Sequence, residues 1–241
     1  MKWNNINMVN GQSAALNLSN EQIQVLITGK FGDGCLIKTP MSVMYSACCI
    51  HEEYIDYKSS LLGDLFQNKH CIENKGFKNR MLYRVYSKAD PRVALICDES
   101  FEDSFNRMDS LGFALWIYDD GTKHKDKEFY QISTQKFSRE IQEDIFVPGL
   151  KDKFDINAKV TPEIKKDGRE YWYLRIGKFD GSYEISNILS QYPIQCYNYK
   201  VWSSETIQKW SRFQEESKSA NIDIRSLNYR EINAKLRHVS I

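Results

Sequence analysis

The sequence contains no long apolar run. No apolar stretch approaches the ~20 residues that a membrane-spanning helix needs, and residues 1–17 lack the apolar segment of a signal peptide. We therefore expect a soluble protein that is not secreted and has no membrane partner. Its 241 residues allow one large domain or two small ones.

The cysteine patterns of zinc sites and disulfide frameworks are also missing. None of the six cysteines is spaced as CxxC, and Cys48 and Cys49 are adjacent. This spacing argues against a zinc ribbon and against a disulfide-stabilised fold. Reduced thiols in a cytosol-like compartment are the expected state.

Net charge is low, because 33 basic residues nearly balance 32 acidic ones and leave +1. A role with nucleic acid must therefore depend on segregated charge. Residues 67–92 contain seven Lys or Arg and two acids, whereas residues 97–120 contain seven acids and one Arg. With 41% hydrophobic and 13% aromatic residues, the chain can also bury a core.

The order of predicted elements, helix-strand-strand-helix-strand-strand-helix, occurs twice. Ser19 and Gln22 have the spacing of a capping box at the first helix. Two apolar helices, one in each repeat, end on Asp33 and Asp120 before a strand pair, which predicts an α+β fold with internal pseudo-twofold symmetry. The predicted helices are 20–31, 51–66 and 93–107, then 111–118, 138–154 and 183–191; the predicted strands are 35–38, 42–50, 69–73 and 80–88, then 122–125, 129–135, 156–164 and 171–176.

A carboxylate just past the last turn of a helix is unfavourable, since that end of the macrodipole is negative. Asp33 and Asp120 share this placement. A divalent cation such as Mg²⁺ would offset the repulsion, and carboxylate-bound metals can activate water and stabilise the leaving oxygen in phosphodiester cleavage. The alternative is that each aspartate, beside its glycine, is an ordinary helix stop.

Three strands alternate apolar with polar residues. In residues 171–176, Trp172, Leu174 and Ile176 share one face, while the other face has two tyrosines and Arg175. Residues 81–88 and 157–161 alternate in the same way. The polar face of each sheet is either a solvated surface or a surface that contacts DNA.

Two stretches carry a resemblance to a known family. LITGKFGDG (residues 26–34) and FALWIYDDG (residues 113–121) resemble the two motifs of single-chain LAGLIDADG homing endonucleases. The likeness extends to HEEYIDYKSSLL (residues 51–62), YQISTQKFSREI (residues 130–141) and YNYKVWSSET (residues 197–206). Thr28 and Lys30 depart from the family pattern.

The resemblance implies two pseudo-symmetric αββαββα halves whose antiparallel sheets form a DNA-binding saddle. Residues 1–108 would be the N-terminal half, residues 109–201 the C-terminal half, and residues 202–241 a helical extension that packs on the second half or reaches flanking DNA. The two motif helices would pack against each other through the small residues Gly29, Gly32 and Ala114. The protein would be a monomer.

The resemblance also implies the site. Asp33 and Asp120 would bind Mg²⁺ or Mn²⁺, with the carbonyls of Gly32 and Asp119 beside them. Lys200 would lie near the scissile phosphate, and Gln135 would order the nucleophilic water. For the first-half counterparts of these two residues, His51 and Arg107 both remain open.

The implied activity is site-specific cleavage of double-stranded DNA across the minor groove, with short 3′ overhangs. A strand of about eight residues spans roughly eight base pairs, so two halves would cover on the order of 20 base pairs. The expected DNA-binding residues are Lys38, Ser42, Ser46, Arg80, Arg84, Tyr86, Lys88, Lys123, Lys125, Gln131, Ser133, Asn157, Lys159, Thr161, Lys165, Lys166, Arg169, Tyr171, Tyr173 and Arg175.

Two related functions remain open on the same fold. An RNA maturase would bind its host intron RNA and would not need both acids, and a non-catalytic DNA-binding regulator would typically lose one or both. Because Asp33 and Asp120 are both present, the nuclease is favoured. The expected location is the cytoplasm or nucleoid of a microbe or phage-infected cell, or an organelle matrix.

Overall fold

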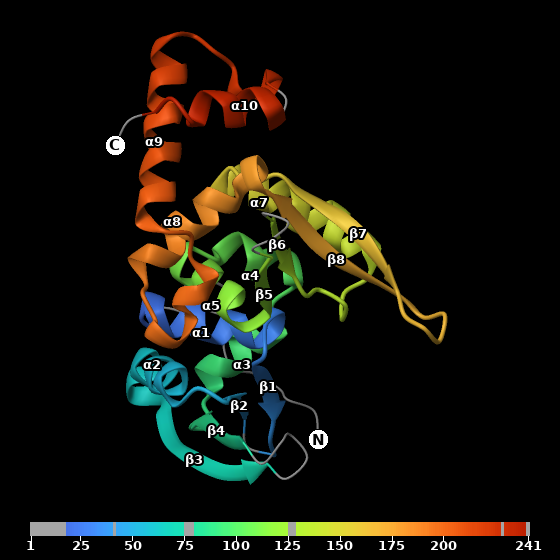
Figure 1. Cartoon of the computed structure of the whole chain (residues 1–241). Helices are drawn as coiled ribbons and strands as arrows, with labels where there is room; N and C mark the ends of the chain where they lie inside the picture. The colour runs from blue at the N-terminus through green and yellow to red at the C-terminus, as the bar shows by residue number, and fades with distance from the viewer. Residues whose placement is uncertain (1–17, 41, 75–79, 125–128, 228, 240–241) are drawn as a thin grey trace, which may run out of the picture. The chain divides into compact units, whose positions relative to one another are not determined.

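The computed structural model describes residues 18–40, 42–74, 80–124, 129–227 and 229–239 (Figure 1). The chain divides into two compact units, Met1–Asp119 and Asp120–Ile241. Each unit contains one four-stranded antiparallel sheet, and the strand order is the same in both. The predicted α+β class and its internal repeat are confirmed.

The sheet of the first unit has the order β1-β2-β4-β3. Its strands are β1 (Cys35–Lys38), β2 (Val43–Cys49), β3 (Phe66–Asn74) and β4 (Arg80–Ser87), and its helices are α1 (Asn20–Phe31), α2 (Glu52–Leu62), α3 (Pro91–Asp98), α4 (Phe101–Arg107) and α5 (Ser110–Asp120). The single helix predicted over residues 93–107 is therefore two helices. The break occurs because the Ser100 side chain accepts the Asp103 N–H at 2.9 Å and caps a new helix.

The core of this unit forms where α1 and α5 meet. Every residue of α5 from Leu111 to Tyr118 is buried, and the Phe31 ring lies 5.8 Å from the Trp116 ring. Gly112 packs on Gln24, whose amide nitrogen donates to the Arg107 carbonyl at 3.0 Å. The α5 helix consequently belongs to the first unit up to Asp119.

The predicted small contacts between these helices are only partly present. A Cβ at Gly32 would meet Asp119 on α5, as expected, but one at Gly29 would meet the Tyr45 ring on β2. Lys30, which interrupts the apolar stripe of α1, donates to the Ile96 carbonyl at 3.0 Å. Its ammonium thus satisfies a carbonyl near the end of α3.

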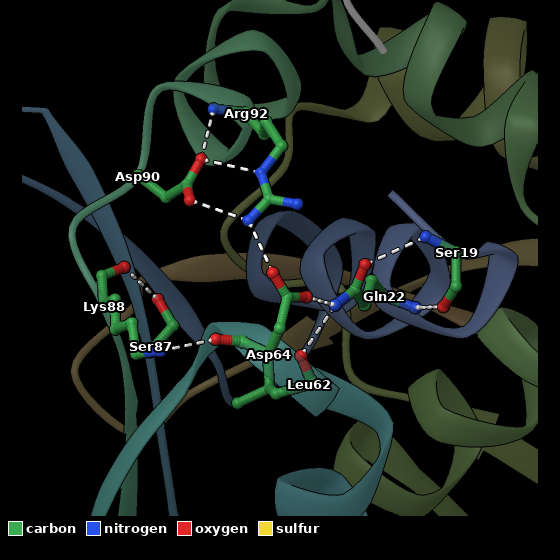
Figure 2. Close-up of polar contacts among 8 residues, drawn as sticks. All are labelled: Ser19, Gln22, Leu62, Asp64, Ser87, Lys88, Asp90 and Arg92. Carbon is green, nitrogen blue, oxygen red and sulfur yellow. Dashed lines mark hydrogen bonds and ion pairs between the residues drawn. The ribbon is translucent and has the colours of Figure 1, made fainter. Parts of the chain in front are cut away.

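A polar network fixes the start of α1 (Figure 2). The predicted capping box is confirmed, since Ser19 and Gln22 each bond the other's main chain. The Gln22 amide nitrogen also donates to the Leu62 carbonyl at 2.8 Å and to the Asp64 carboxylate at 2.5 Å. Arg92, near the start of α3, bridges Asp64 and Asp90 at 2.9 and 2.8 Å. Three segments far apart in sequence are joined by these contacts.

The Arg92 network should make part of the stability depend on pH. Hydrogen bonds from Arg92 lower the pKa of Asp64 and of Asp90 below the ordinary value of 3.8. A lowered folded-state pKa adds stability above the unfolded value, and that stability is lost as the pH falls below it. We expect Arg92→Met to lower the free energy of unfolding more at about pH 6.5 than at about pH 3. Urea unfolding at both pH values checks this; equal losses would contradict it.

The sheet of the second unit has the order β5-β6-β8-β7. Its strands are β5 (Gly121–His124), β6 (Phe129–Ile132), β7 (Ala158–Ile164) and β8 (Glu170–Gly177), and its helices include α6 (Arg139–Ile141), α7 (Val147–Phe154) and α8 (Tyr183–Gln191). A π-helical turn, Gln142–Phe146, continues α6 directly into α7, so the single helix predicted over residues 138–154 is present with one wider turn inside it. It contains the buried Gln142, whose oxygen accepts the Thr134 hydroxyl at 2.8 Å and whose nitrogen donates to the Thr134 carbonyl at 3.2 Å.

The C-terminal extension consists of α9 (Ser204–Ser219) and α10 (Tyr229–Leu236), drawn in orange and red in Figure 1. Helix α9 packs on α8 and α10 packs on α9, and the three helices share a mainly aromatic cluster formed by Tyr183, Trp210, Phe213, Ile232 and Val239. The Trp210 ring nitrogen donates to Glu184 at 3.1 Å. Of the two placements left open by the sequence, these helices pack on the second half. Among the described residues, no helix is both long and apolar enough to cross a bilayer.

Candidate active site and nucleic-acid interface

The segment Gly32-Asp33-Gly34 ends α1. The Gly32 N–H donates to the Thr28 carbonyl at 2.8 Å, and Asp33 is exposed directly after it. A Cβ on Gly32 would lie 2.3 Å from Oδ2 of Asp119, and one on Gly34 would lie 2.8 Å from Cε2 of Tyr45. Glycine is needed on both sides of Asp33 because buried side chains touch the backbone there.

Helix α5 presents the second acid. It begins with the Asp109 carboxylate accepting the Leu111 and Gly112 N–H groups at 2.8 and 3.1 Å, and it ends at Asp120. Asp120 is half-buried, and its carbonyl accepts the Ser133 N–H at 2.9 Å. Each predicted acid therefore stands at the C-terminal end of a buried helix, where the helix dipole favours a cation.

Asp119, the residue before Asp120, has its carboxylate in a buried ion pair with Lys58 of α2. Nζ of Lys58 lies 2.7 Å from Oδ1 and 2.9 Å from Oδ2, and both side chains are 1% exposed. The Tyr54 hydroxyl donates to Oδ1 at 2.7 Å, and the Asp33 N–H donates to Oδ2 at 3.2 Å. Burial alone would lower the pKa of Lys58, but the Asp119 carboxylate outweighs burial and raises it. Lys58 is therefore charged at neutral pH.

The role of Lys58 was not predicted from sequence, although a signal was present. The apolar residues of this helix predict an inner face formed by Tyr54, Tyr57, Leu61, Leu62 and Leu65. In the structure Tyr54, Lys58 and Leu62, spaced four residues apart, are buried, whereas Tyr57 and Leu61 are only half-buried. A lysine within an apolar stripe at this spacing predicts a buried charge that needs a carboxylate partner.

The structure gives Lys200 and Gln135 different surroundings. Lys200 is 4% exposed at the end of a short helix, Gln195–Lys200, and its ammonium lies 4.6 Å from the centre of the Tyr197 ring. Its carbonyl accepts the Tyr130 hydroxyl. Gln135 follows β6 and lines a hollow of about 450 Å³ with residues of the β7–β8 hairpin tip: Lys165, Lys166, Asp167, Arg169 and Tyr171.

The two candidates for the first-half basic residue also have defined places. His51 is the residue before α2, and its N–H donates to the Cys49 sulfur at 3.4 Å. Arg107, at the end of α4, forms an ion pair with Glu99. Within the described residues, no three His, Cys, Asp or Glu side chains form a ready metal cluster.

The face of the second sheet that points away from the helices carries a basic and aromatic surface. Arg175 pairs in register with Gln131 on one side and Lys159 on the other, so all three side chains share that face. The Arg175 guanidinium lies 4.4 Å from the Phe129 ring centre, and that ring stacks on His124. Of the predicted DNA-binding residues, those on this outer face are Gln131, Lys159, Thr161, Tyr171, Tyr173 and Arg175.

The first sheet has a similar outer face around Arg84. Register places Arg84 opposite Cys48 and His70, and its guanidinium donates to the Tyr86 hydroxyl at 3.2 Å. Tyr86 in turn pairs with Ser46. The predicted residues on this face are Ser46, Arg80, Arg84 and Tyr86.

Several expected DNA-binding residues lie elsewhere. Lys38 pairs with the buried Val43 and bonds Asp98 at 3.3 Å, and Lys123 pairs with the buried Tyr130 and donates to the Val201 carbonyl. Both lysines are therefore on the helix-covered side of their sheets, because side chains alternate along a strand. Lys88 donates to the Asp64 carbonyl at 2.8 Å. Ser42 lies in the turn before β2, Ser133 lies just after β6, and Asn157 precedes β7. Lys165, Lys166 and Arg169 lie at the tip of the β7–β8 hairpin. Lys125 is outside the described residues.

Comparison with known proteins decides the family. Residues 26–181 match the LAGLIDADG DNA endonuclease family. The chain belongs to that family. The matched range contains both aspartate-ended motifs and both sheets of the LAGLIDADG fold, so the resemblance drawn from residues 26–34 and 113–121 is confirmed.

One solved structure supports the LAGLIDADG fold. The homing endonuclease I-WcaI, bound to its DNA recognition sequence, is 20% identical over 77% of this chain and 87% of that chain, with a TM-score of 0.64. I-DmoI in complex with DNA and Mn is 14% identical over 71% of this chain and 98% of that chain, with a TM-score of 0.46. WhiA from Thermatoga maritima is 15% identical over 92% of this chain and 70% of that chain, with a TM-score of 0.45. No curated protein matches the chain.

Proposed function

We propose that this LAGLIDADG protein is a site-specific, divalent-metal-dependent DNA endonuclease that cuts both strands of a long duplex target. The observation that carries the proposal is the pair of aspartates, Asp33 and Asp120, each placed at the end of a buried helix within the matched family range. I-WcaI, which shares the fold, is a homing endonuclease bound to its DNA recognition sequence. The target spans on the order of 20 base pairs, since each sheet offers strands of about eight residues.

The donor chemistry at the helix ends fits a hard divalent cation. Asp33 and Asp120 offer carboxylate oxygens, Gly32 and Asp119 offer main-chain carbonyls, and the C-terminal ends of two helices add negative potential. The Asp119 carboxylate is instead committed to Lys58 and Tyr54. Bound Mg²⁺ or Mn²⁺ would supply an activated water and would stabilise the leaving oxygen.

The chain's own residues would bind and orient the DNA. The outer faces around Arg84 and Arg175 would contact the grooves and phosphates, and antiparallel ribbons fit the major groove. We further propose cleavage across the minor groove with short 3′ overhangs, by a monomer in the cytoplasm or nucleoid of a microbe or phage-infected cell or in an organelle matrix. Lys200 and Gln135 remain the proposed second-half residues near the phosphate and the water.

A metal-exchange assay tests this activity. We expect a plasmid that carries the selected target to be linearised in Mg²⁺ or Mn²⁺ and to stay intact in EDTA. Ca²⁺ should support binding without cutting. A protein that bound intron RNA but left every duplex intact in Mg²⁺ would instead be a maturase.

Arg175→Ala should weaken DNA binding and make it less dependent on salt. A lost phosphate contact should lower the slope of log affinity against log salt by about 0.9, and a lost base contact should relax specificity at one position. Arg139→Ala is the matched control, because Arg139 lies over Trp172 on the other side of the same sheet and pairs with Glu143. Binding titrations on the target at several salt concentrations measure both variants; equal effects would argue against the outer face as the DNA surface.

A further inference from the structure

The main chain of Asp33, just after the end of α1, is restrained by a hydrogen bond to Asp119. The Asp33 N–H donates to Oδ2 of Asp119 at 3.2 Å, although Asp33 is an exposed residue. This bond restrains the peptide that leads into the Asp33 Cα, from which the side chain extends. Whatever fixes the Asp119 carboxylate therefore also restrains the backbone that carries the carboxylate we propose as a metal ligand.

The Asp119 carboxylate is itself firmly fixed. Besides the Asp33 N–H, it accepts hydrogen bonds from Lys58 at 2.7 and 2.9 Å and from Tyr54 at 2.7 Å. Lys58 also lies 4.6 Å from the centre of the Tyr54 ring. All of these donors come from α2 or from the second residue after α1, and a buried carboxylate with charge-assisted bonds has little freedom to move.

The backbone is shaped to receive this carboxylate. The close approach at Gly32 leaves no room for a Cβ beside Asp119, and Gly34 lies against the fully buried Tyr45. The backbone of Gly32 thus contacts the buried side chain of Asp119, and the backbone of Gly34 contacts that of Tyr45. The two glycines therefore do more than end the helix. They let the backbone on either side of the exposed Asp33 pack directly against Asp119 and Tyr45.

We propose that Asp119 is a positioning residue, supported by Lys58 and Tyr54, whose carboxylate holds the Asp33 peptide and so sets the Asp33 carboxylate for metal binding. This inference rests on the proposed function. If the ion pair served only folding, any well-packed neutral pair at positions 58 and 119 would replace it. Positioning, in contrast, requires a hydrogen-bond acceptor at position 119.

Two double variants separate these roles. Lys58→Met/Asp119→Asn and Lys58→Met/Asp119→Leu both remove the buried charges and keep similar side-chain volumes. Only the first keeps an oxygen that can accept the Asp33 N–H. Urea unfolding of both full-length variants first establishes that they fold and how stable each is.

The first readout does not depend on nuclease activity. Hydrogen exchange of the Asp33 amide, followed by NMR, should be as slow in the Asn variant as in the parent and at least about tenfold faster in the Leu variant. Equal protection in the Leu variant and the parent would overturn the proposal. So would an Asn variant as fast as the Leu variant.

The second readout is single-turnover cleavage of bound DNA in Mg²⁺. The Asn variant should stay within about fivefold of the parent, while the Leu variant should fall on the order of 100-fold with binding in Ca²⁺ retained. Similar rates for the two variants would overturn the positioning role in catalysis. If the parent itself cut no DNA but the exchange pattern held, the proposed function would fail while the hold on Asp33 stood.

Discussion

Asn at either Asp33 or Asp120 is expected to abolish double-strand cleavage while leaving DNA binding nearly unchanged. The substitution keeps the side-chain size but removes the charge that a divalent metal needs. Enzymes supply up to ~10¹⁷-fold acceleration or more for phosphodiester hydrolysis, so losing a metal ligand should remove detectable cutting. Binding rests on the sheets, and affinity in Ca²⁺ should stay within about tenfold, or roughly 1.4 kcal/mol.

The assay for these variants is plasmid linearisation in Mg²⁺ together with a binding titration in Ca²⁺. Asp144→Asn is the matched control, since it makes the same change at an exposed acid in the turn between α6 and α7. The control should cut like the parent. Linearisation at near the parental rate by either active-site variant would show that the two-aspartate mechanism is incorrect.

Lys58→Met is expected to be far more destabilising than the loss of a lysine from an exposed ion pair. It leaves the Asp119 carboxylate, which is 1% exposed, without its counter-charge. Removing one partner of a buried ion pair typically lowers the free energy of unfolding by about 3–5 kcal/mol. Tyr54 and the Asp33 N–H would remain as donors, but neither carries a charge.

Lys69→Met is the control for this prediction. Lys69 also pairs with two carboxylates of α2, Glu52 at 2.9 Å and Asp56 at 2.5 Å, but the three side chains are 29%, 51% and 55% exposed. Exposed pairs contribute only about 0–1 kcal/mol. Urea unfolding of both variants at neutral pH measures the contrast. Losses of similar size at the two positions would mean that Asp119 tolerates the absence of its partner.

Local signals in the sequence were sufficient for most of the fold. The capping box at Ser19 and Gln22 and the glycines around Asp33 mark both ends of α1, and alternation separates Arg175 from Leu174. The break at Ser100 was missed because a short apolar pattern continues on both sides of it. The spacing Ser100-x-x-Asp103 is nevertheless a helix N-cap signal, and it marks the start of α4.

The candidate site was less accessible from sequence, since it depends on contacts between distant segments. The placement of Asp33 and Asp120 was visible in the motifs, but the hold of Asp119 on the Asp33 peptide joins residues far apart in the chain. Lys38 and Lys123 were chosen for their charge, although counting by two from Leu36 already places Lys38 on the core side. Residue type alone cannot show which face of a strand a lysine occupies.

The most direct test of the central claim is selection of cut sites from a randomised duplex library in Mg²⁺, with the Asp33→Asn/Asp120→Asn variant run in parallel. We expect the parent to enrich cleaved molecules that share one long site, on the order of 20 base pairs, with short 3′ overhangs. The variant should enrich none, although it binds the same site in Ca²⁺. A parent that bound DNA yet yielded no more cleaved molecules than the variant would contradict the account.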